Sequence, residues 1–310
     1  MKKFLYFILC AQMCFAQEIV SENLHLYNDS IYLPGTLSYP KLSGKLPLAI
    51  FIHGSGNGDR DGNQGNLVKS DHIKQLADSL NSHGIAFYRY DKRSATVENL
   101  NHFKMETFRI GDLANDADIA IQKFSKDTRF ASLHLIGHSQ GSLVGMLAVS
   151  EAIDSYISLA GPGTSIDKTM IRQLTAQNED MGKVAAAYFK ELKETDTIQN
   201  VNPFLLSIFA PMNQKYLKDW ASLNPSEKIK ELNIPTLIIN GDADSQITIE
   251  DANLLSKSKP DAKLSIIKKM NHLLKTVTNY AENQRSYSDP SFPISADLIE
   301  VISEFIKTNE

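Results

Sequence analysis

The stretch LHLIGHSQGSLVGMLA, residues 133–148, changes its periodicity in the middle. It begins as an apolar run typical of a buried strand, and it ends with Leu143 and Leu147 at helical spacing. Between the two halves stand the letters GHSQG, residues 137–141. Because glycine lacks Cβ, it allows a sharp turn and a close approach of neighbouring backbone. We therefore predict a strand, a tight turn with Ser139 at its tip, and a buried helix.

This strand, turn and helix are the context in which G-x-S-x-G indicates a nucleophile elbow. The turn would lift the hydroxyl of Ser139 clear of the sheet, at the positive end of a helix, where a developing anion is stabilised. A glycine-flanked turn with a solvated serine is the other interpretation. A serine becomes a strong nucleophile only beside a base that a third group orients, so the rest of the chain must supply both.

Two later strands end in side chains that could fill these roles. The strand at 236–240 is followed by GDADSQI, and the strand at 263–270 is followed by NHLLK. In this topology the acid and then the histidine follow the serine along the chain. We therefore expect His272 to be the general base and Asp244 the orienting acid. Asp242 remains a competitor, because a loop that turned differently would present it instead.

A glycine-rich loop follows the early apolar strand, in the letters FIHGSG. Such a loop can present a backbone N–H to the oxyanion of a tetrahedral intermediate. We expect the N–H groups of Ser55 and Gln140 to form this pair, with His53 and Gly54 supporting the loop. Ser55 is a poor nucleophile candidate, because no helix follows it.

The remaining chain alternates strands with helices, which predicts a mostly parallel sheet covered on both faces. Residues 163–232 interrupt the alternation with helix-like segments only. About 70 residues is too long for a connection, so we predict an inserted helical cap. The core would then comprise 17–162 and 233–310. Strands are expected as a hairpin over 19–39 and at 46–54, 85–91, 155–162, 234–244 and 262–272, and helices at 70–83, 111–125 and 295–308.

Composition limits the function classes. The 310 residues are 42% hydrophobic and 22% charged, with a net charge of −4, as expected for a soluble globular chain of one large or two small domains. Lys and Arg form no cluster that would bind nucleic acid. After residue 17 no stretch approaches the roughly 20 apolar residues of a membrane span. The oligomeric state is left open by the sequence.

The first residues have the order of a secretory signal. MKKFLYFILCAQMCFAQ places two lysines before a short apolar core and a small residue, Ala16, at its exit. We expect residues 1–16 to be a signal peptide and the mature chain to be periplasmic or secreted. Cleavage there would remove Cys10 and Cys14 and leave no cysteine for a disulfide.

Together these features resemble the α/β-hydrolase family over most of the mature chain. HGSGNGDRDGN, residues 53–63, and YRYDKRS, residues 88–94, are similar to the branch of bacterial secreted esterases that are serine aminopeptidase-like or dienelactone-hydrolase-like. The resemblance implies the α/β-hydrolase fold, a triad of Ser139, Asp244 and His272, and a helical cap over an acyl pocket. We expect no cofactor and no metal, since the metal motif HExxH is absent and no cluster of His and carboxylate residues suggests a catalytic zinc.

Four charged residues of these two segments match positions that shape the loops beside the site in such enzymes. An ion-paired network that only supports the loops is the other interpretation, and we prefer it to a catalytic role. The residues are Asp59, Arg60, Asp61 and Arg93.

The resulting expectation is a serine hydrolase that cleaves small-molecule carboxylic esters through an acyl-enzyme. A cap rich in methionine and aromatic residues favours an apolar acyl or aryl group, although these side chains could equally form the core of the cap. They are Met170, Met181, Phe189, Phe204, Phe209, Met212 and Trp220.

Three alternatives remain: a serine aminopeptidase, a lysophospholipase, and a binding protein without catalysis on the same scaffold. An aminopeptidase needs an acidic pocket for the ammonium group of its substrate. The cap offers Glu179, Asp180, Glu191 and Glu194, which could equally lie on a solvated helix face.

Overall fold

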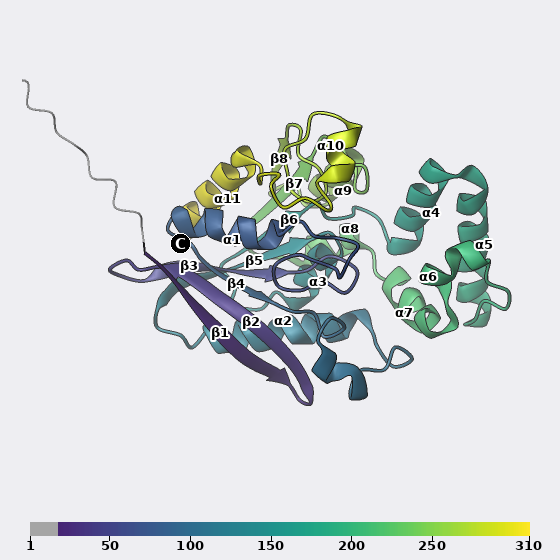
Figure 1. Cartoon of the computed structure of the whole chain (residues 1–310), viewed down its shortest axis with the longest axis horizontal. Helices are drawn as coiled ribbons and strands as arrows, with labels where there is room; N and C mark the ends of the chain where they lie inside the picture. The colour runs from purple at the N-terminus through teal and green to yellow at the C-terminus, as the bar shows by residue number, and fades with distance from the viewer. Residues whose placement is uncertain (1–17) are drawn as a thin grey trace, which may run out of the picture.

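A computed structural model describes residues 18–310, so the expected signal peptide lies outside the described residues. The chain forms one eight-stranded sheet in the order β1-β2-β4-β3-β5-β6-β7-β8 (Figure 1). The β1–β2 and β2–β4 pairs are antiparallel, and all other neighbours are parallel. The strands are β1 Ile19–Asn28, β2 Ile31–Pro40, β3 Leu46–Ile52, β4 Ala86–Tyr90, β5 Phe130–His138, β6 Ser155–Leu159, β7 Thr236–Gly241 and β8 Lys263–Ile267.

The central strands are apolar because both faces of the sheet are covered. Side chains of β3 alternate between two cores, with Leu48 and Ile50 in one and Ala49 and Phe51 in the other. On one face lie α1 (His72–Ser82) and α11 (Ala296–Thr308); on the other lie α2 (Ile110–Phe124), α3 (Gln140–Ala148) and α9 (Ile249–Ser258). This confirms the predicted mostly parallel, doubly covered sheet. Helix α9 and the short α10 (Tyr280–Arg285) were not predicted.

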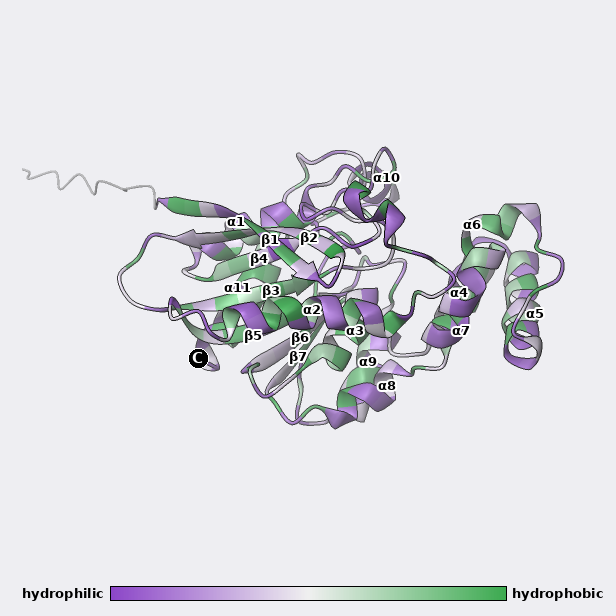
Figure 2. Cartoon of the chain, turned by 90° about the horizontal axis from the view of Figure 1, so that it is seen from below, coloured by the Kyte–Doolittle hydropathy of each residue, from purple (hydrophilic) through white to green (hydrophobic). Residues whose placement is uncertain are grey.

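The segment between β6 and β7 contains helices only. Four of them form a lobe at one end of the molecule, which both views show (Figures 1 and 2): α4 (Ile166–Gln177), α5 (Glu179–Thr195), α6 (Leu206–Phe209) and α7 (Pro211–Ala221). This cap has its own core, which includes Phe189 and Phe209. The last part, α8 (Pro225–Lys228) and a 3-10 turn over Ile229–Glu231, packs against the sheet side of the molecule instead. The reason is Ile229, which is fully buried in the main core.

Polar contacts attach the cap to the sheet domain. The guanidinium of Arg172 on α4 pairs with the buried carboxylate of Asp251 on α9 at 2.5 Å. From α7, the carboxylate of Asp219 accepts the backbone N–H of Ile110 at the start of α2, at 2.9 Å. The cap is therefore joined to α9 through α4 and to the start of α2 through α7. No helix within residues 18–310 combines the length and apolar character needed to cross a membrane.

Candidate active site

Ser139 lies at the tip of a strained turn between β5 and α3. Its backbone has φ 53° and ψ −120°, a conformation that non-glycine residues rarely adopt. The two flanking glycines are required by close approach: a Cβ on Gly137 would collide with the backbone of Gly141, and a Cβ on Gly141 would collide with the carbonyl group of Ile52. The turn therefore has the geometry that the GHSQG motif predicts, and it exposes the hydroxyl of Ser139 to a cavity.

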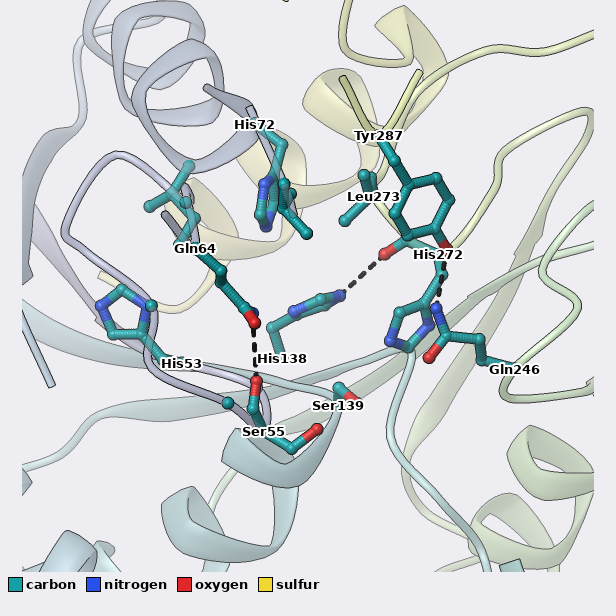
Figure 3. Close-up of a pocket in the computed structure, with 16 residues that line it drawn as sticks. His53, Ser55, Gln64, His72, His138, Ser139, Gln246, His272, Leu273 and Tyr287 are labelled. Atoms are coloured by element: carbon teal, nitrogen blue, oxygen red, sulfur yellow. Dashed lines mark hydrogen bonds between the residues drawn. The ribbon is translucent and has the colours of Figure 1, made fainter. Parts of the chain in front are cut away.

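His272 lines the same cavity as Ser139, and both side chains are visible in Figure 3. Its Nδ1 bonds the Oδ2 of Asp244 at 2.8 Å, with the side chains only 8% and 0% exposed. The other oxygen of Asp244 accepts the backbone N–H groups of Gln246 and Ile247 at 2.8 and 3.0 Å. The carboxylate is thus fixed on both sides, so it can hold the imidazole in one tautomer.

Asp242 does not face the histidine. Its Oδ1 accepts the backbone N–H of Lys269 at 2.5 Å, near the surface. Of the two acids considered from the sequence, the structure therefore joins Asp244 to His272 and uses Asp242 to support the neighbouring loop.

The residue before the nucleophile also touches the base. His138 hydrogen-bonds the backbone carbonyl of His272 through Nε2 at 2.9 Å, so this nitrogen donates (Figure 3). The two rings lie 4.9 Å apart between centroids. On the far side, the Asn271 side chain accepts the N–H groups of Leu273 and Lys275 at 3.1 and 3.0 Å. The loop that carries the base is therefore tied to the elbow and to itself.

Two other histidines lie beside the site: His53 was expected there as support for the glycine-rich loop, and His72 was not predicted there. His72 is buried, bonds the hydroxyl of Ser70 at 2.8 Å and lines the cavity. His53 contacts the carbonyl of Tyr90 at 2.5 Å. Burial lowers the pKa of His53 to about 4 and that of His72 to about 3, and it lowers the pKa of His138 well below the usual value. All three are neutral at physiological pH. The local sequence around His72 carries no motif that would have revealed its place.

The two expected oxyanion donors are available. Within residues 18–310, neither the N–H of Ser55 nor that of Gln140 is bonded to a carbonyl or a side chain. Ser55 follows β3, and Gln140 is the first residue of α3, so both belong to backbone beside Ser139. Gly54 lies against the elbow, because a Cβ on it would come within 3.2 Å of the Cβ of Ser139. Unpaired N–H groups at a helix start are the arrangement that binds an anion.

The four charged loop residues form ion pairs or turns behind the site. Arg60 pairs with Asp91 at 2.8 Å, Asp61 with Arg89 at 3.0 Å and Arg93 with Asp116 at 2.6 Å. Asp59 accepts the N–H groups of Asp61 and Asn63 at 3.0 and 2.8 Å. None of these four residues lines the cavity beside Ser139 or the larger cavity between the core and the cap that is described next. Their contacts hold the loops instead.

Two cavities meet at the glycine-rich loop of residues 53–56, which we call the oxyanion loop. The first, which we call the histidine cavity, measures about 240 Å³ and is lined by His53, His72, His138, His272 and Ser139 among others (Figure 3). The second, which we call the aromatic cavity, measures about 590 Å³ and lies between the core and the cap. Ser55 and Gly56 line both cavities, and Gln140 lines the second. A substrate bound at Ser139 could thus extend to both sides.

The aromatic cavity takes its walls from two parts of the chain. The cap supplies Met170, Tyr216 and Trp220, and the loop before α2 supplies Phe103 and Phe108. The rings of Phe108 and Tyr216 stack at 4.7 Å, across the boundary between the core and the cap. This loop was not predicted as part of the site. The available signal was that its aromatic residues lie in a segment without regular apolar periodicity.

The methionine and aromatic residues of the cap therefore divide into groups. Met170 and Trp220 line the aromatic cavity, Phe189 and Phe209 form the cap core, and Met181 packs against that core. The other two, Phe204 and Met212, are exposed.

The acidic residues of the cap lie elsewhere. Glu179 and Asp180 pair with Lys183 on the exposed surface of α5. Glu191 accepts the N–H of Gln199, also at the surface, and Glu194 is exposed. Among the described residues that line the two cavities, none is an aspartate or a glutamate. No group of three His, Cys, Asp or Glu side chains within residues 18–310 is placed to hold a metal ion.

Comparison with known proteins identifies the family of the chain. A model of the family described as "Serine aminopeptidase, S33" matches residues 64–228, which is more than half of the chain. Esterase EstD of Thermotoga maritima is 28% identical over 249 residues, covering 78% of this chain. The chain spans 58% of the length of that relative.

Solved structures share the fold at lower identity. Est1E from Butyrivibrio proteoclasticus is 19% identical, with a TM-score of 0.57 over 92% of this chain and 96% of that chain. The acylaminoacyl peptidase of Pyrococcus horikoshii is 14% identical, with a TM-score of 0.59 over 95% of this chain and 42% of its own. Both comparisons support the same arrangement of sheet and helices.

Proposed function

Because the chain belongs to the serine aminopeptidase S33 family and has the α/β-hydrolase fold, we propose that it is a serine hydrolase that cleaves carboxylic esters through an acyl-enzyme. The observation that carries this proposal is the 2.8 Å hydrogen bond between the buried Asp244 and His272, which lines the same cavity as Ser139. The esterase name of the Thermotoga maritima relative supports the ester specificity.

In the proposed mechanism, the hydroxyl oxygen of Ser139 attacks the ester carbonyl while Nε2 of His272 takes its proton. Asp244 holds the other ring nitrogen in the protonated form and stabilises the imidazolium. The negative oxygen of the tetrahedral intermediate is bound by the N–H groups of Ser55 and Gln140. The intermediate collapses, the carbon–oxygen bond to the alcohol breaks, and His272 returns the proton to the alcohol. Water, activated by the same base, then releases the acid from Ser139.

The aromatic cavity indicates the kind of substrate. Its apolar walls comprise the rings and the thioether described above together with Leu100, Ile208 and Leu217, and its volume of about 590 Å³ exceeds that of the histidine cavity. We propose a small-molecule ester with an apolar acyl or aryl group in this cavity.

Peptidase activity on the same triad is the second candidate, favoured by the family description and by the fold shared with an acylaminoacyl peptidase. A free α-ammonium group would need a carboxylate in the pocket. The described lining of both cavities offers none, and Lys92 adds a cation to the aromatic cavity. An ester or a blocked peptide fits this lining better than a free amino terminus.

The test compares the native chain with Ser139→Ala. The native chain should hydrolyse p-nitrophenyl esters and be labelled by a fluorophosphonate, and the variant should do neither. An inactive native chain would support a binding protein on this scaffold, and an active Ser139→Ala variant would exclude the mechanism. A panel of acyl lengths, lysophospholipids and aminoacyl anilides would rank the ester, lipid and peptide activities. EDTA should leave the rate unchanged.

We also propose that the chain is exported after cleavage near Ala16. The support is the order of two lysines, an apolar core and a small exit residue in residues 1–16. Expression in a bacterial host with the native N-terminus should yield a mature chain that begins near Gln17 outside the cytoplasm. An intact, cytoplasmic chain would contradict the proposal.

A further inference from the structure

The side chain of Lys92, within the segment YRYDKRS, lies behind the oxyanion loop. It follows β4, is only 6% exposed and lines the aromatic cavity. Its ammonium donates to the carbonyl of Gly54 at 2.8 Å and to the Oε1 of Gln140 at 3.1 Å. Within residues 18–310, no carboxylate lies within ion-pairing distance of this ammonium. A buried cation without a paired anion is costly and needs a reason.

Both contacts lead to the proposed oxyanion donors. The carbonyl of Gly54 and the N–H of Ser55 belong to one peptide group, and the peptide bonds of the described chain are trans. In a trans peptide the carbonyl and the N–H point in opposite directions, so a cation on the carbonyl side leaves the N–H directed away from it. An ammonium on the carbonyl also polarises the peptide and strengthens the N–H as a donor.

The second contact fixes the residue that carries the other donor. The amide of Gln140 is held between Lys92 and the cap, because its Nε2 donates to the hydroxyl of Tyr216 at 2.7 Å. The backbone N–H of Lys92 in turn donates to the carbonyl of Gly58 at 3.2 Å, which ties the oxyanion loop to the end of β4. One side chain therefore touches the peptide of the first donor and the residue of the second.

We propose that Lys92 is a positioning residue of the oxyanion hole: it orients and polarises the peptide that presents the Ser55 N–H, and it fixes Gln140. The proposal rests on the ester-hydrolase function proposed above. It assigns to Lys92 an effect on the tetrahedral intermediate and little effect on binding of the uncharged ester.

Lys92→Met tests this assignment, because methionine fills most of the space without the charge. Loss of one oxyanion donor typically costs on the order of 100- to 1000-fold, so weakening both should lower kcat by about 10- to 100-fold while KM changes less than about threefold. A trifluoromethyl ketone, which forms a charged hemiketal with Ser139, should lose affinity by the same factor as kcat/KM falls. A residue that only supported the fold would not produce this match.

Lys259→Met is the matched control. Lys259 is also buried but lines neither cavity: its ammonium donates to the carbonyl of Leu232 at 2.9 Å and pairs with the carboxylate of Asp261 at 2.8 Å. This variant should lose stability and keep both kcat and the affinity for the ketone. If Lys92→Met does not fold, Lys92→Gln, which keeps a donor without the charge, provides the same comparison.

The pH profile gives an independent measurement. Burial lowers the pKa of Lys92 to about 8, so the native kcat should fall as the ammonium loses its proton above that pH. The titratable groups around it do not change state there: His53 is neutral, burial raises the pKa values of Tyr90 and Tyr216, and Asp116 is paired with Arg93. The alkaline fall should be absent in the Lys92 variants.

Lys275 provides the competing explanation of an alkaline fall. Burial lowers its pKa to about 8 as well, and it bonds backbone carbonyls of Ser70 and Phe292 behind the base loop. An alkaline fall that persists in Lys92→Met would overturn the assignment to Lys92. So would a folded Lys92→Met with native kcat and native affinity for the ketone. If the native chain is inactive or Ser139→Ala is active, the proposed function itself fails.

Discussion

Replacing Asp244 by asparagine isolates the contribution of one carboxylate to the base. Oδ1 of Asp244 accepts the N–H groups of Gln246 and Ile247, while Oδ2 bonds Nδ1 of His272 at 2.8 Å. In Asp244→Asn, the amide oxygen would stay on the two N–H groups, and the amide nitrogen would face the imidazole. Nδ1 would then have to accept a hydrogen bond, which moves the ring proton to Nε2. In that tautomer, Nε2 has no lone pair to accept the proton of Ser139.

The expected loss follows from this change of tautomer. A triad with the wrong tautomer loses about 1000- to 10,000-fold in kcat, which corresponds to about 4 to 5.5 kcal/mol of transition-state stabilisation. Because both backbone hydrogen bonds are kept, the free energy of unfolding should change by less than about 1 kcal/mol. Hydrolysis of a p-nitrophenyl ester measures the first quantity, and urea unfolding measures the second.

Asp242→Asn is the matched comparison two residues away. The oxygen of asparagine can still accept the Lys269 N–H, so kcat should change less than about threefold. Equal losses in the two variants, or a larger loss in Asp242→Asn, would refute the assignment of the acid. A folded Asp244→Asn that kept more than a tenth of the native rate would refute the tautomer argument.

Three further outcomes are expected. Gly141→Ala should destabilise the fold by about 2 kcal/mol or more, since its Cβ would overlap the carbonyl group of Ile52. Burial lowers the pKa of His134 to about 4. Between pH 6.5 and 4 the unfolded chain therefore binds one proton more than the folded chain at this residue, and the free energy of unfolding falls on acidification. His134→Gln should reduce the slope of the free energy of unfolding against pH by the equivalent of one proton. Arg172→Met should lower the free energy of unfolding by about 1 to 2 kcal/mol. This loss is smaller than for a fully buried pair, because the side chain of Arg172 is 36% exposed while that of Asp251 is buried.

Each of these outcomes has a comparison. Gly111→Ala, where a Cβ would meet open space in helix α2, should be neutral or stabilising in urea unfolding. His134→Gln should keep the native kcat, because His134 lines neither site cavity. Arg172→Lys keeps the charge and should recover part of the loss. An unchanged urea midpoint in Gly141→Ala, an unchanged pH slope in His134→Gln, or native stability in Arg172→Met would contradict the respective argument.

Local sequence was sufficient for the features that depend on neighbouring residues. The strand, turn and helix around Ser139 follow from a change of periodicity and two glycines, and the structure shows why each glycine is required. The alternation of buried strands with helices likewise indicated the parallel sheet. Sequence favoured Asp244 over Asp242, but both acids lie in one short loop after β7, and only the turn of that loop decides which one meets His272.

The walls of the site were beyond local reasoning for a different reason. His72 and Phe108 lie far along the chain from Ser139 and carry no motif. They reach the cavities only because α1 begins, and the loop before α2 ends, at the same edge of the sheet. The contact of Lys92 with Gly54 and Gln140 likewise joins three segments that are separate in sequence.

The amino-acid sequence by itself determined the elbow, the class of fold and the candidate nucleophile and base, because these depend on steric and periodic rules within a few residues. Only the tertiary structure decided which carboxylate bonds the candidate base, which rings line the aromatic cavity, and which cation contacts the carbonyl of Gly54. Those choices depend on distances between segments, and these distances are set by the packing of the whole sheet and its helices.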